Sequence, residues 1–143
     1  MIDKMQYYHG AAIVSLLEND NLSIKKKGNS GYIISENLFV FLKYTTKART
    51  PWRFNFDQEE IDRCLKMASE YKNIALGLIC GGDGVCGLGW SDVFSILGDK
   101  PGWISAQRKH NESYSVAGSI GRLKRKIPVG RWSNIFSETL IHN

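Results

Sequence analysis

The sequence predicts a single α+β domain built around a mixed β-sheet that is flanked by helices. Two apolar runs, residues 38–44 and 74–80, show little polar alternation, which is typical of strands buried on both faces. A helical pattern at residues 57–72 separates them, as in a right-handed β-α-β crossover with parallel strands. A chain of 143 residues can bury a core without metals or disulfides, so we expect residues 1–143 to form one domain.

The first elements are expected to be a helix and a hairpin. Apolar residues recur at helical spacing along one stripe of residues 5–18, and the Asn-Asp-Asn sequence that follows ends the pattern. Residues 22–26 and 32–35 predict two short strands, because the five residues between them are rich in turn formers. With the strand at 38–44, the chain therefore begins in the order α-β-β-β.

The helix at residues 57–72 has the clearest start signal in the chain, and a short alternating strand at 52–56 precedes it. Asp57 is the expected N-cap, and Glu60 stands three residues later, as in a capping box. Phe56 is placed to pack on Ile61 across the cap. The strand at 74–80 then completes a core of order α-β-β-β-α-β.

The glycine-rich residues 81–84 are expected to form a hairpin turn, because Asp-Gly between apolar runs is a strong hairpin signal. The alternative is a phosphate-binding loop, but such loops open onto a helix and end in Gly-Lys-Ser/Thr. Ser91 is the expected cap of a short helix that ends at Leu97.

Beyond Pro101 the pattern predicts small strands separated by glycine turns, at residues 103–108, 114–117 and 123–127. The domain would then consist of a core of about residues 1–97 and a basic, β-rich extension of about residues 98–143.

The composition favours a cytoplasmic protein without bound cofactors. No apolar run approaches the ~20 residues of a membrane helix, so we expect no membrane contact, and the first residues lack the apolar core of an export signal. Three cysteines are too few for a disulfide framework, which fits a reducing compartment. The histidines are scattered and no Cys-x-x-Cys pair exists, so no zinc site is expected.

Cys80 and Cys86 flank the 81–84 turn, where buried packing is favoured over a redox pair. His9 is expected on the buried side of the first helix.

The net charge of +5 is distributed unevenly. Residues 1–97 contain 11 basic and 11 acidic side chains, whereas residues 98–143 contain 8 basic and 3 acidic ones. A second basic block runs from Lys25 to Arg53. Two basic segments that form one face would suit a polyanion such as DNA or RNA. The alternative is that they are solvated strand edges, where lysines prevent aggregation.

Two segments contain the candidate residues for binding anions. The loop after the 38–44 strand and the residues next to it provide Lys47, Arg49, Trp52 and Arg53, which are types that contact phosphates and stack on bases. The alternative for this loop is an ordinary polar connection with Trp52 packed beneath it. In the second segment, a strand over 122–126 would point Arg122, Lys124 and Lys126 to one side as a cationic ladder. The alternative for the ladder is a charged edge strand.

The order α-β-β-β-α-β, with Lys43 near the end of the central strand, resembles that of the restriction-endonuclease-like superfamily. The resemblance implies a nuclease fold in which an Asp and a Glu-x-Lys motif hold Mg²⁺ and activate water. Here Phe41 stands two residues before Lys43, and residues 31–34 contain no carboxylate where the Asp would lie. The resemblance therefore implies an inactive relative. Lys43, Glu36 and Glu18 are the catalytic candidates, and Lys43 is also a candidate anion contact. The alternative for Lys43 is a strand-end lysine that reaches solvent.

These observations favour a non-catalytic protein that binds nucleic acid or another polyanion. An active nuclease is the first alternative, in which displaced carboxylates such as Glu18 and Glu36 would bind Mg²⁺. A protein-interaction module is the second alternative, in which surface Trp and Tyr side chains would bind a protein partner.

Overall fold

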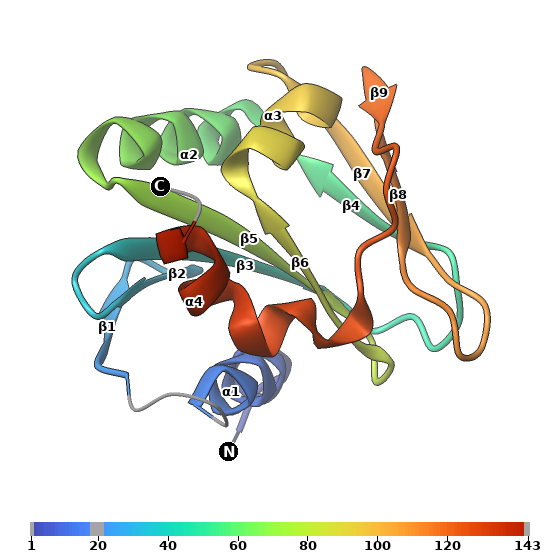
Figure 1. Cartoon of the computed structure of the whole chain (residues 1–143), viewed down its shortest axis with the longest axis horizontal. Helices are drawn as coiled ribbons and strands as arrows, with labels where there is room; N and C mark the ends of the chain where they lie inside the picture. The colour runs from blue at the N-terminus through green and yellow to red at the C-terminus, as the bar shows by residue number, and fades with distance from the viewer. Residues whose placement is uncertain (1, 18–21, 142–143) are drawn as a thin grey trace.

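The computed structural model describes residues 2–17 and 22–141, which form two β-sheets surrounded by helices (Figure 1). The elements are, in chain order, α1 (Lys4–Leu17), β1 (Ile24–Lys27), β2 (Gly31–Ile34), β3 (Leu38–Thr45), β4 (Trp52–Phe56), α2 (Gln58–Glu70), β5 (Asn73–Cys80), β6 (Gly84–Gly89), α3 (Trp90–Leu97), β7 (Gly102–Gln107), β8 (Ser115–Gly118), β9 (Gly121–Arg122), the 3-10 helix η1 (Val129–Asn134) and α4 (Ile135–Ile141).

The first sheet is the predicted mixed sheet, with five strands in the order β1-β2-β3-β5-β6. Its central strands β3 and β5 are parallel, and Phe39 pairs with Ile74. The other neighbouring strands are antiparallel. Every residue of β5 is buried, which explains its apolar run without alternation. The prediction that the two apolar runs are parallel neighbours is confirmed.

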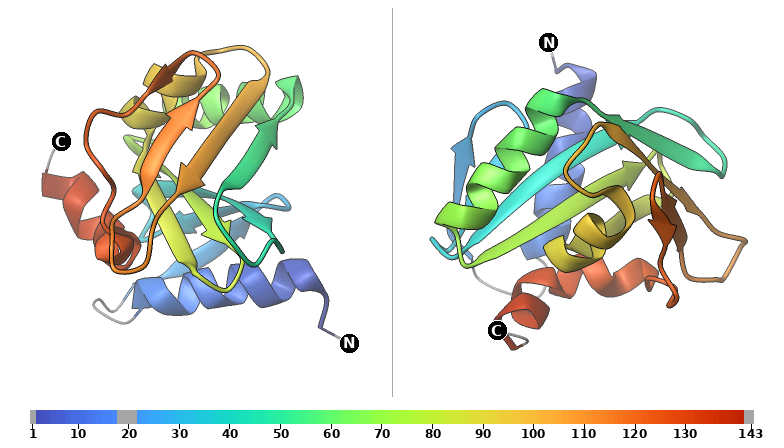
Figure 2. Two further views of the ribbon diagram at one scale, coloured as in Figure 1. Left: turned by 90° about the vertical axis from the view of Figure 1, so that its right-hand side faces the viewer. Right: turned by 90° about the horizontal axis from the view of Figure 1, so that it is seen from above.

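Two hydrophobic cores cover the two faces of this sheet. One contains Leu16 of α1, Leu38 and Leu42 of β3, and Trp132 of η1. The other joins the opposite face to α2, α3 and the second sheet (Figure 2). Successive residues of β3 alternate between the two cores, as the pleat of a strand requires.

The second sheet is antiparallel, with four strands in the order β4-β7-β8-β9. The sequence predicted that the strands after about residue 98 form an extension separate from the core. The second sheet differs from this prediction, because its first strand, β4, comes from the region expected to form the core. The side chains of Trp52, Phe54 and Phe56 alternate inward along β4 and join the same core as α2. Because β4 belongs to the second sheet, it does not interrupt the predicted core. The remaining elements from α1 to β5 keep the predicted order α-β-β-β-α-β.

Residues 129–141, to which the sequence pattern assigned no element, form η1 and α4 and close one side of the first sheet (Figure 1). Trp132 is 1% exposed, and its indole N–H donates to the carbonyl of Ala12 at 2.9 Å. Glycine is required beneath this ring, because a Cβ on Gly77 would lie 2.8 Å from Trp132 and 2.7 Å from Leu42. This close contact joins the end of the chain to β5.

Most local predictions in the core are confirmed. Asp57 and Glu60 form the expected capping box, and residues 81–83 form the turn of the β5–β6 hairpin. His9 is 3% exposed, and its Nδ1 lies 3.0 Å from the Tyr32 hydroxyl. Burial, and next the charge of Lys26, lower the pKa of His9. The residues expected to end α1, 19–21, lie outside the described residues.

Two local predictions are wrong. Ser91 does not cap α3: the helix begins at Trp90, and its N-cap is Gly89 without a side-chain hydrogen bond. The expected strand at 123–127 is also absent from the described residues, since β9 ends at Arg122 and a bend follows. Only Ile127 makes an isolated bridge, with Tyr114. The physical reason lies at Arg125: a strand that turns Leu123 to the core would turn Arg125 there as well, whereas Lys124, Arg125 and Lys126 are all exposed.

Candidate nucleic-acid interface

The exposed side of the second sheet, which we call the outer sheet face, brings together cations from two distant parts of the chain. Arg53 of β4 pairs with Ser105, Ser105 with Ala117, and Ala117 with Arg122 of β9. Directly paired residues of antiparallel strands have side chains on the same side of the sheet. One row of residues therefore crosses all four strands, with an arginine at each end.

The outer sheet face also has an aromatic side chain beside this row. Trp103 of β7 pairs with Asn55 of β4, one position further along the same face. The guanidinium of Arg53 lies over its indole, 4.8 Å from the ring centroid. A cation over an aromatic ring is an attractive contact, so Arg53 and Trp103 position each other.

Alternation along the strands explains why these residues are exposed. Ile104 and Ala106 of β7 point into the core, so that Trp103 and Ser105 lie on the other side. Along β4, Arg53 and Asn55 are exposed between buried aromatic residues. The inward apolar set determines the register of the strands, and thereby which residues reach solvent.

No described element covers the outer sheet face, as the left view of Figure 2 shows. Within residues 2–17 and 22–141, no carboxylate forms an ion pair with Arg53 or Arg122. Their charges are therefore available to a ligand, and the side chains between them in the row, Ser105 and Ala117, are small. The result is a cationic platform with one partly exposed indole.

The loop between β3 and β4 contributes less than the sequence predicted. Trp52 is 2% exposed, and its indole N–H donates to the carbonyl of Lys47 at 3.0 Å. The Lys47 ammonium turns back onto the carbonyl of Pro51 at 2.9 Å. The expectation that Trp52 stacks on a base is corrected, because packing under the loop leaves no ring face open. Arg49 is exposed at the loop surface.

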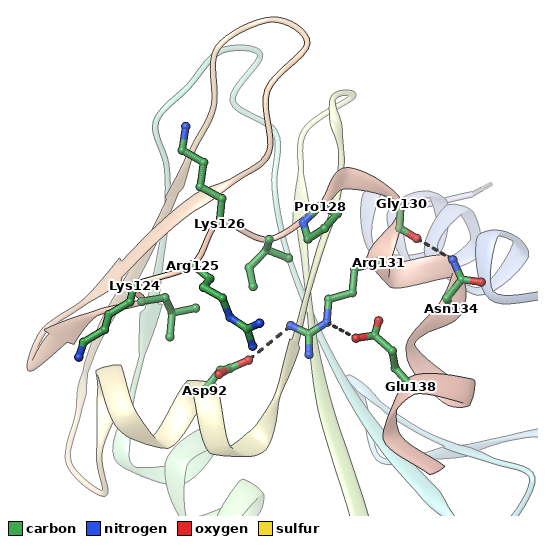
Figure 3. A pocket seen from close by; sticks show the side chains of 11 residues that line it. Asp92, Lys124, Arg125, Lys126, Pro128, Gly130, Arg131, Asn134 and Glu138 are labelled. Carbon is green, nitrogen blue, oxygen red and sulfur yellow. Dashed lines mark hydrogen bonds and ion pairs between the residues drawn. The ribbon is translucent and has the colours of Figure 1, made fainter. Parts of the chain in front are cut away.

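The predicted ladder of Arg122, Lys124 and Lys126 is not a strand, and its members separate. Arg122 lies on the outer sheet face, whereas Lys124 and Lys126 line a hollow of about 680 Å³ together with Arg125 (Figure 3). Lys126 also pairs with Glu112 at 3.5 Å across the surface. The bend after β9 places these cations around the edge of the second sheet.

Arg131 forms the opposite wall of this hollow. Its guanidinium contacts Glu138 of α4 at 3.3 Å and Asp92 of α3 at 3.4 Å (Figure 3). It also donates to the Gly87 carbonyl at 3.3 Å. Both carboxylates offset its charge and tie three elements together. We therefore assign Arg131 a structural role, and the cations available around the hollow are Lys124 and Arg125.

The two candidate catalytic residues that the structure describes, Lys43 and Glu36, do not converge. Lys43 is only partly the solvent-reaching lysine of the alternative. Its side chain is 18% exposed, but its ammonium pairs with Glu60 at 2.7 Å, contacts the Asn55 carbonyl and lies over the Phe56 ring. The same Glu60 carboxylate closes the α2 capping box. Glu36 is exposed in the turn before β3, at the opposite end of that strand from Lys43, and Glu18 lies outside the described residues. The described residues contain no group of three potential metal ligands.

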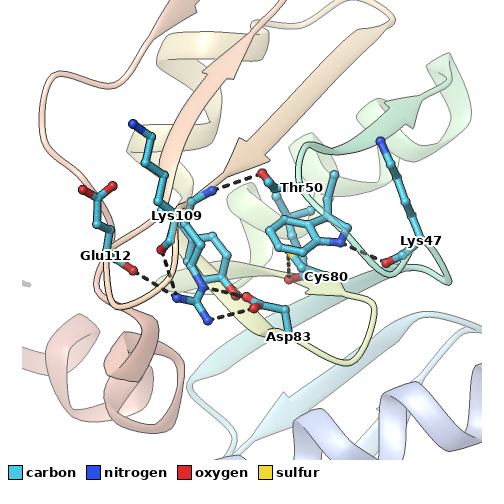
Figure 4. Close-up of polar contacts among 10 residues, drawn as sticks. Lys47, Thr50, Cys80, Asp83, Lys109 and Glu112 are labelled. Carbon is cyan, nitrogen blue, oxygen red and sulfur yellow. Dashed lines mark hydrogen bonds and ion pairs between the residues drawn. The ribbon is translucent and has the colours of Figure 1, made fainter.

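A polar cluster joins the turn of the β5–β6 hairpin to the residues between β7 and β8. Arg108 donates two hydrogen bonds of 2.7 Å to the Asp83 carboxylate, and the Tyr114 hydroxyl donates a third at 2.8 Å (Figure 4). Burial opposes ionisation of Asp83, but these hydrogen bonds outweigh it and hold the pKa of Asp83 below its ordinary value. Because its members satisfy one another, this cluster fastens the hairpin to the second sheet.

The cysteines pack as buried thiols. Cys80 and Cys86 are unpaired and each 0% exposed, and Cys86 pairs in register with Leu78 rather than with Cys80. Burial raises the pKa of the Cys80 thiol to about 12 and that of Cys86 well above its usual value. Thiols of this kind are unreactive near neutral pH.

Sequence reasoning identified Arg53 and Arg122 but missed Trp103, Arg125 and Arg131. The alternation of Trp103, Ser105 and Gln107 with Ile104 and Ala106 was the available signal for Trp103. No sequence signal could have placed Arg131 against α3 and α4, because that contact depends on the tertiary path of the chain.

No family model, curated protein or solved structure matches the chain. None of the helices in the described parts of the chain has the length and apolar content needed to cross a membrane.

Proposed function

We propose that this protein binds nucleic acid without catalysing a reaction on it, and that the outer sheet face is the binding surface. The observation that carries the proposal is the row in which Arg53 and Arg122 lie on one open face beside Trp103. Neighbouring strands are about 4.8 Å apart, so the two arginine backbones are about 14 Å apart across three strand gaps. A nucleic-acid strand that lies across the sheet would contact both.

Charge supports a polyanion as the ligand. Arginine matches phosphate with a planar fork of donors, and phosphate contacts provide most of the affinity of proteins that bind without sequence preference. Lys124 and Arg125 extend the positive surface around the sheet edge. The unpaired cysteines fit a reducing, cytoplasmic location.

The resemblance to the restriction-endonuclease-like superfamily remains part of this proposal, as a degenerate relative without activity. The order of elements in the first sheet supports it. The ion pair between Lys43 and Glu60 supports a structural role for Lys43, the lysine at the motif position.

A protein-interaction module is the second candidate, and the outward side of α1 favours it. Tyr7 and Val14 of α1 are 68% and 62% exposed, and Ile2, which precedes the helix, is 76% exposed. Exposed apolar groups of this size are typical of surfaces that contact other proteins. Such binding would be lost on truncation of Tyr7 and would depend little on salt, which separates it from binding by the outer sheet face.

The test is retention of duplex DNA, single-stranded DNA and RNA on filters at low and high salt. We expect binding that is insensitive to sequence and weakens steeply with salt. Charge reversal by Arg53→Glu or Arg122→Glu should weaken low-salt binding by roughly tenfold or more, since a charged contact contributes about 1.5 to 3 kcal/mol. Lys25→Glu is the matched control, because Lys25 is exposed on β1 at the far edge of the other sheet. No retention of any nucleic acid at low salt would reject the proposal.

A further inference from the structure

The outer sheet face is too wide for the groove of a DNA duplex. The four strands span about 14 Å between the backbones of β4 and β9, and side chains add to that width. The major groove of B-DNA is about 12 Å wide and accepts a helix or a two-stranded ribbon. A duplex could therefore meet this face only through its phosphates, with its bases out of reach of Trp103.

The surroundings of Trp103 suit an unstacked base. One side of the indole is covered by the guanidinium of Arg53, at 4.8 Å. Toward β8 its neighbour is Ser119, whose backbone N–H donates to the Trp103 carbonyl at 3.0 Å, and the adjacent outer-face residue is Ala117. Both side chains are small, so neither competes with a base for contact with the indole.

The arginines flank this aromatic group in the order that a single strand requires. Arg53 lies on β4 beside Trp103, and Arg122 lies two strands beyond Trp103 on β9. Proteins that bind single strands combine cations that contact the backbone with aromatic rings on which bases stack. Bases of single strands are free to be splayed out, whereas those of a duplex are stacked on each other.

We infer that the ligand of the outer sheet face is single-stranded nucleic acid, with one base stacked on Trp103 and the flanking phosphates bound by Arg53 and Arg122. This inference rests on the proposed function and specifies its ligand. Stacking requires only a base plane, so every base can occupy the position, and binding selects strandedness rather than sequence.

The test compares a single-stranded oligonucleotide with a duplex of the same length, using tryptophan fluorescence and filter binding on the intact protein. We expect the single strand to bind more tightly and to quench tryptophan emission. Trp103→Phe should remove most of the quenching and retain much of the affinity, because a phenyl ring still stacks. Trp103→Ala should weaken single-strand binding by roughly 5- to 150-fold, the equivalent of about 1 to 3 kcal/mol per stacked base. Duplex binding should stay unchanged in both variants.

Trp90→Phe is the matched control, because Trp90 lies on α3 away from the outer sheet face and packs against the core. It should retain both the quenching and the affinity. Equal binding of duplex and single strand, or an equal loss for both in Trp103→Ala, would overturn the inference while leaving nucleic-acid binding by the arginines in place. Failure of every nucleic acid to bind would overturn both. A circular dichroism spectrum and melting temperature like those of the wild type show that each variant is folded.

Discussion

Arg53 and Arg122 occupy the two ends of a single row of paired residues, although their residue numbers differ by 69. Strand order places them there: β4 and β9 are the two edge strands of the second sheet, and β7 and β8 lie between them. A ligand that reaches both arginines must cross the whole sheet, which gives the two side chains a shared role.

That shared role predicts the salt dependence of variants. Each phosphate neutralised on a single strand adds roughly 0.7 to the slope of the logarithm of the binding constant against the logarithm of salt concentration. We expect Arg53→Gln and Arg122→Gln each to reduce the slope by about that amount, and the double variant to reduce it by about twice as much. Binding titrations at four or more salt concentrations measure the slopes. An unchanged slope in both single variants would place the phosphate contacts elsewhere.

The cluster of Asp83, Arg108 and Tyr114 predicts how stability depends on pH. The pKa of Asp83 is lower in the folded chain than the value of about 3.9 for an unfolded aspartate. As the pH falls, the unfolded chain therefore takes up the proton first, so the carboxylate stabilises the fold fully above about pH 5 and loses this effect as the pH falls through its folded pKa.

Asp83→Asn should accordingly lower the free energy of unfolding at neutral pH by about 1.5 to 3 kcal/mol, the range for hydrogen bonds to charged groups. The difference from the wild type should shrink below about pH 4. Urea unfolding at several pH values measures this difference in the free energy of unfolding. Asp99→Asn, at an exposed site, is the control. A difference that is constant from neutral pH to pH 3 would contradict the role assigned to the carboxylate.

The contact between Gly77 and Trp132 predicts a loss of stability on adding a single methyl group. A Cβ at Gly77 would lie within 2.8 Å of both Leu42 and Trp132, inside a packed core. Gly77→Ala should therefore lower the free energy of unfolding by about 1 to 3 kcal/mol. Gly82→Ala, where no atom lies within 4 Å of the added Cβ, should change it little. Equal stabilities of the two variants in denaturant titrations would mean that η1 does not pack on β5 in this way.

The environment of Lys43 predicts that the protein does not cleave DNA with Mg²⁺ or Mn²⁺. The lysine is paired with Glu60, and that carboxylate already accepts the Asp57 N–H of the capping box. Hard cations need several well-placed oxygen ligands, which the described residues around Lys43 do not provide. Incubation of plasmid DNA with each metal tests this prediction. Metal-dependent cleavage that disappears in Lys43→Ala would show that the nuclease alternative is right.

Local patterns of the sequence predicted the first sheet well, because its signals are short-range. The capping box at Asp57 and the apolar runs of β3 and β5 depend on neighbouring residues, and the fold retains them. The partnership of β4 with β7 was not predictable in this way, since it joins Trp52 to Ala106 across 54 positions.

The candidate site was predicted only in part for the same reason. Composition pointed to Arg53 and Arg122, but only the register of the second sheet shows that they share a face. Trp52 was the wrong aromatic residue, because alternation along β4 sends it inward while alternation along β7 sends Trp103 outward. Choosing between them requires knowing which side of the strands the core occupies.

The location of binding can be tested directly by following the tryptophan indole N–H signals in ¹H–¹⁵N correlation spectra during titration with a single-stranded oligonucleotide. The indole N–H of Trp52 donates to Lys47 and that of Trp132 donates to Ala12, so both are internal reporters that a surface ligand should leave unchanged. We predict that the Trp103 indole signal shifts, together with the backbone amides of β4, β7, β8 and β9. Shifts confined to α1 and β1, or a Trp103 signal that does not move while the oligonucleotide binds, would contradict the assignment of binding to the outer sheet face.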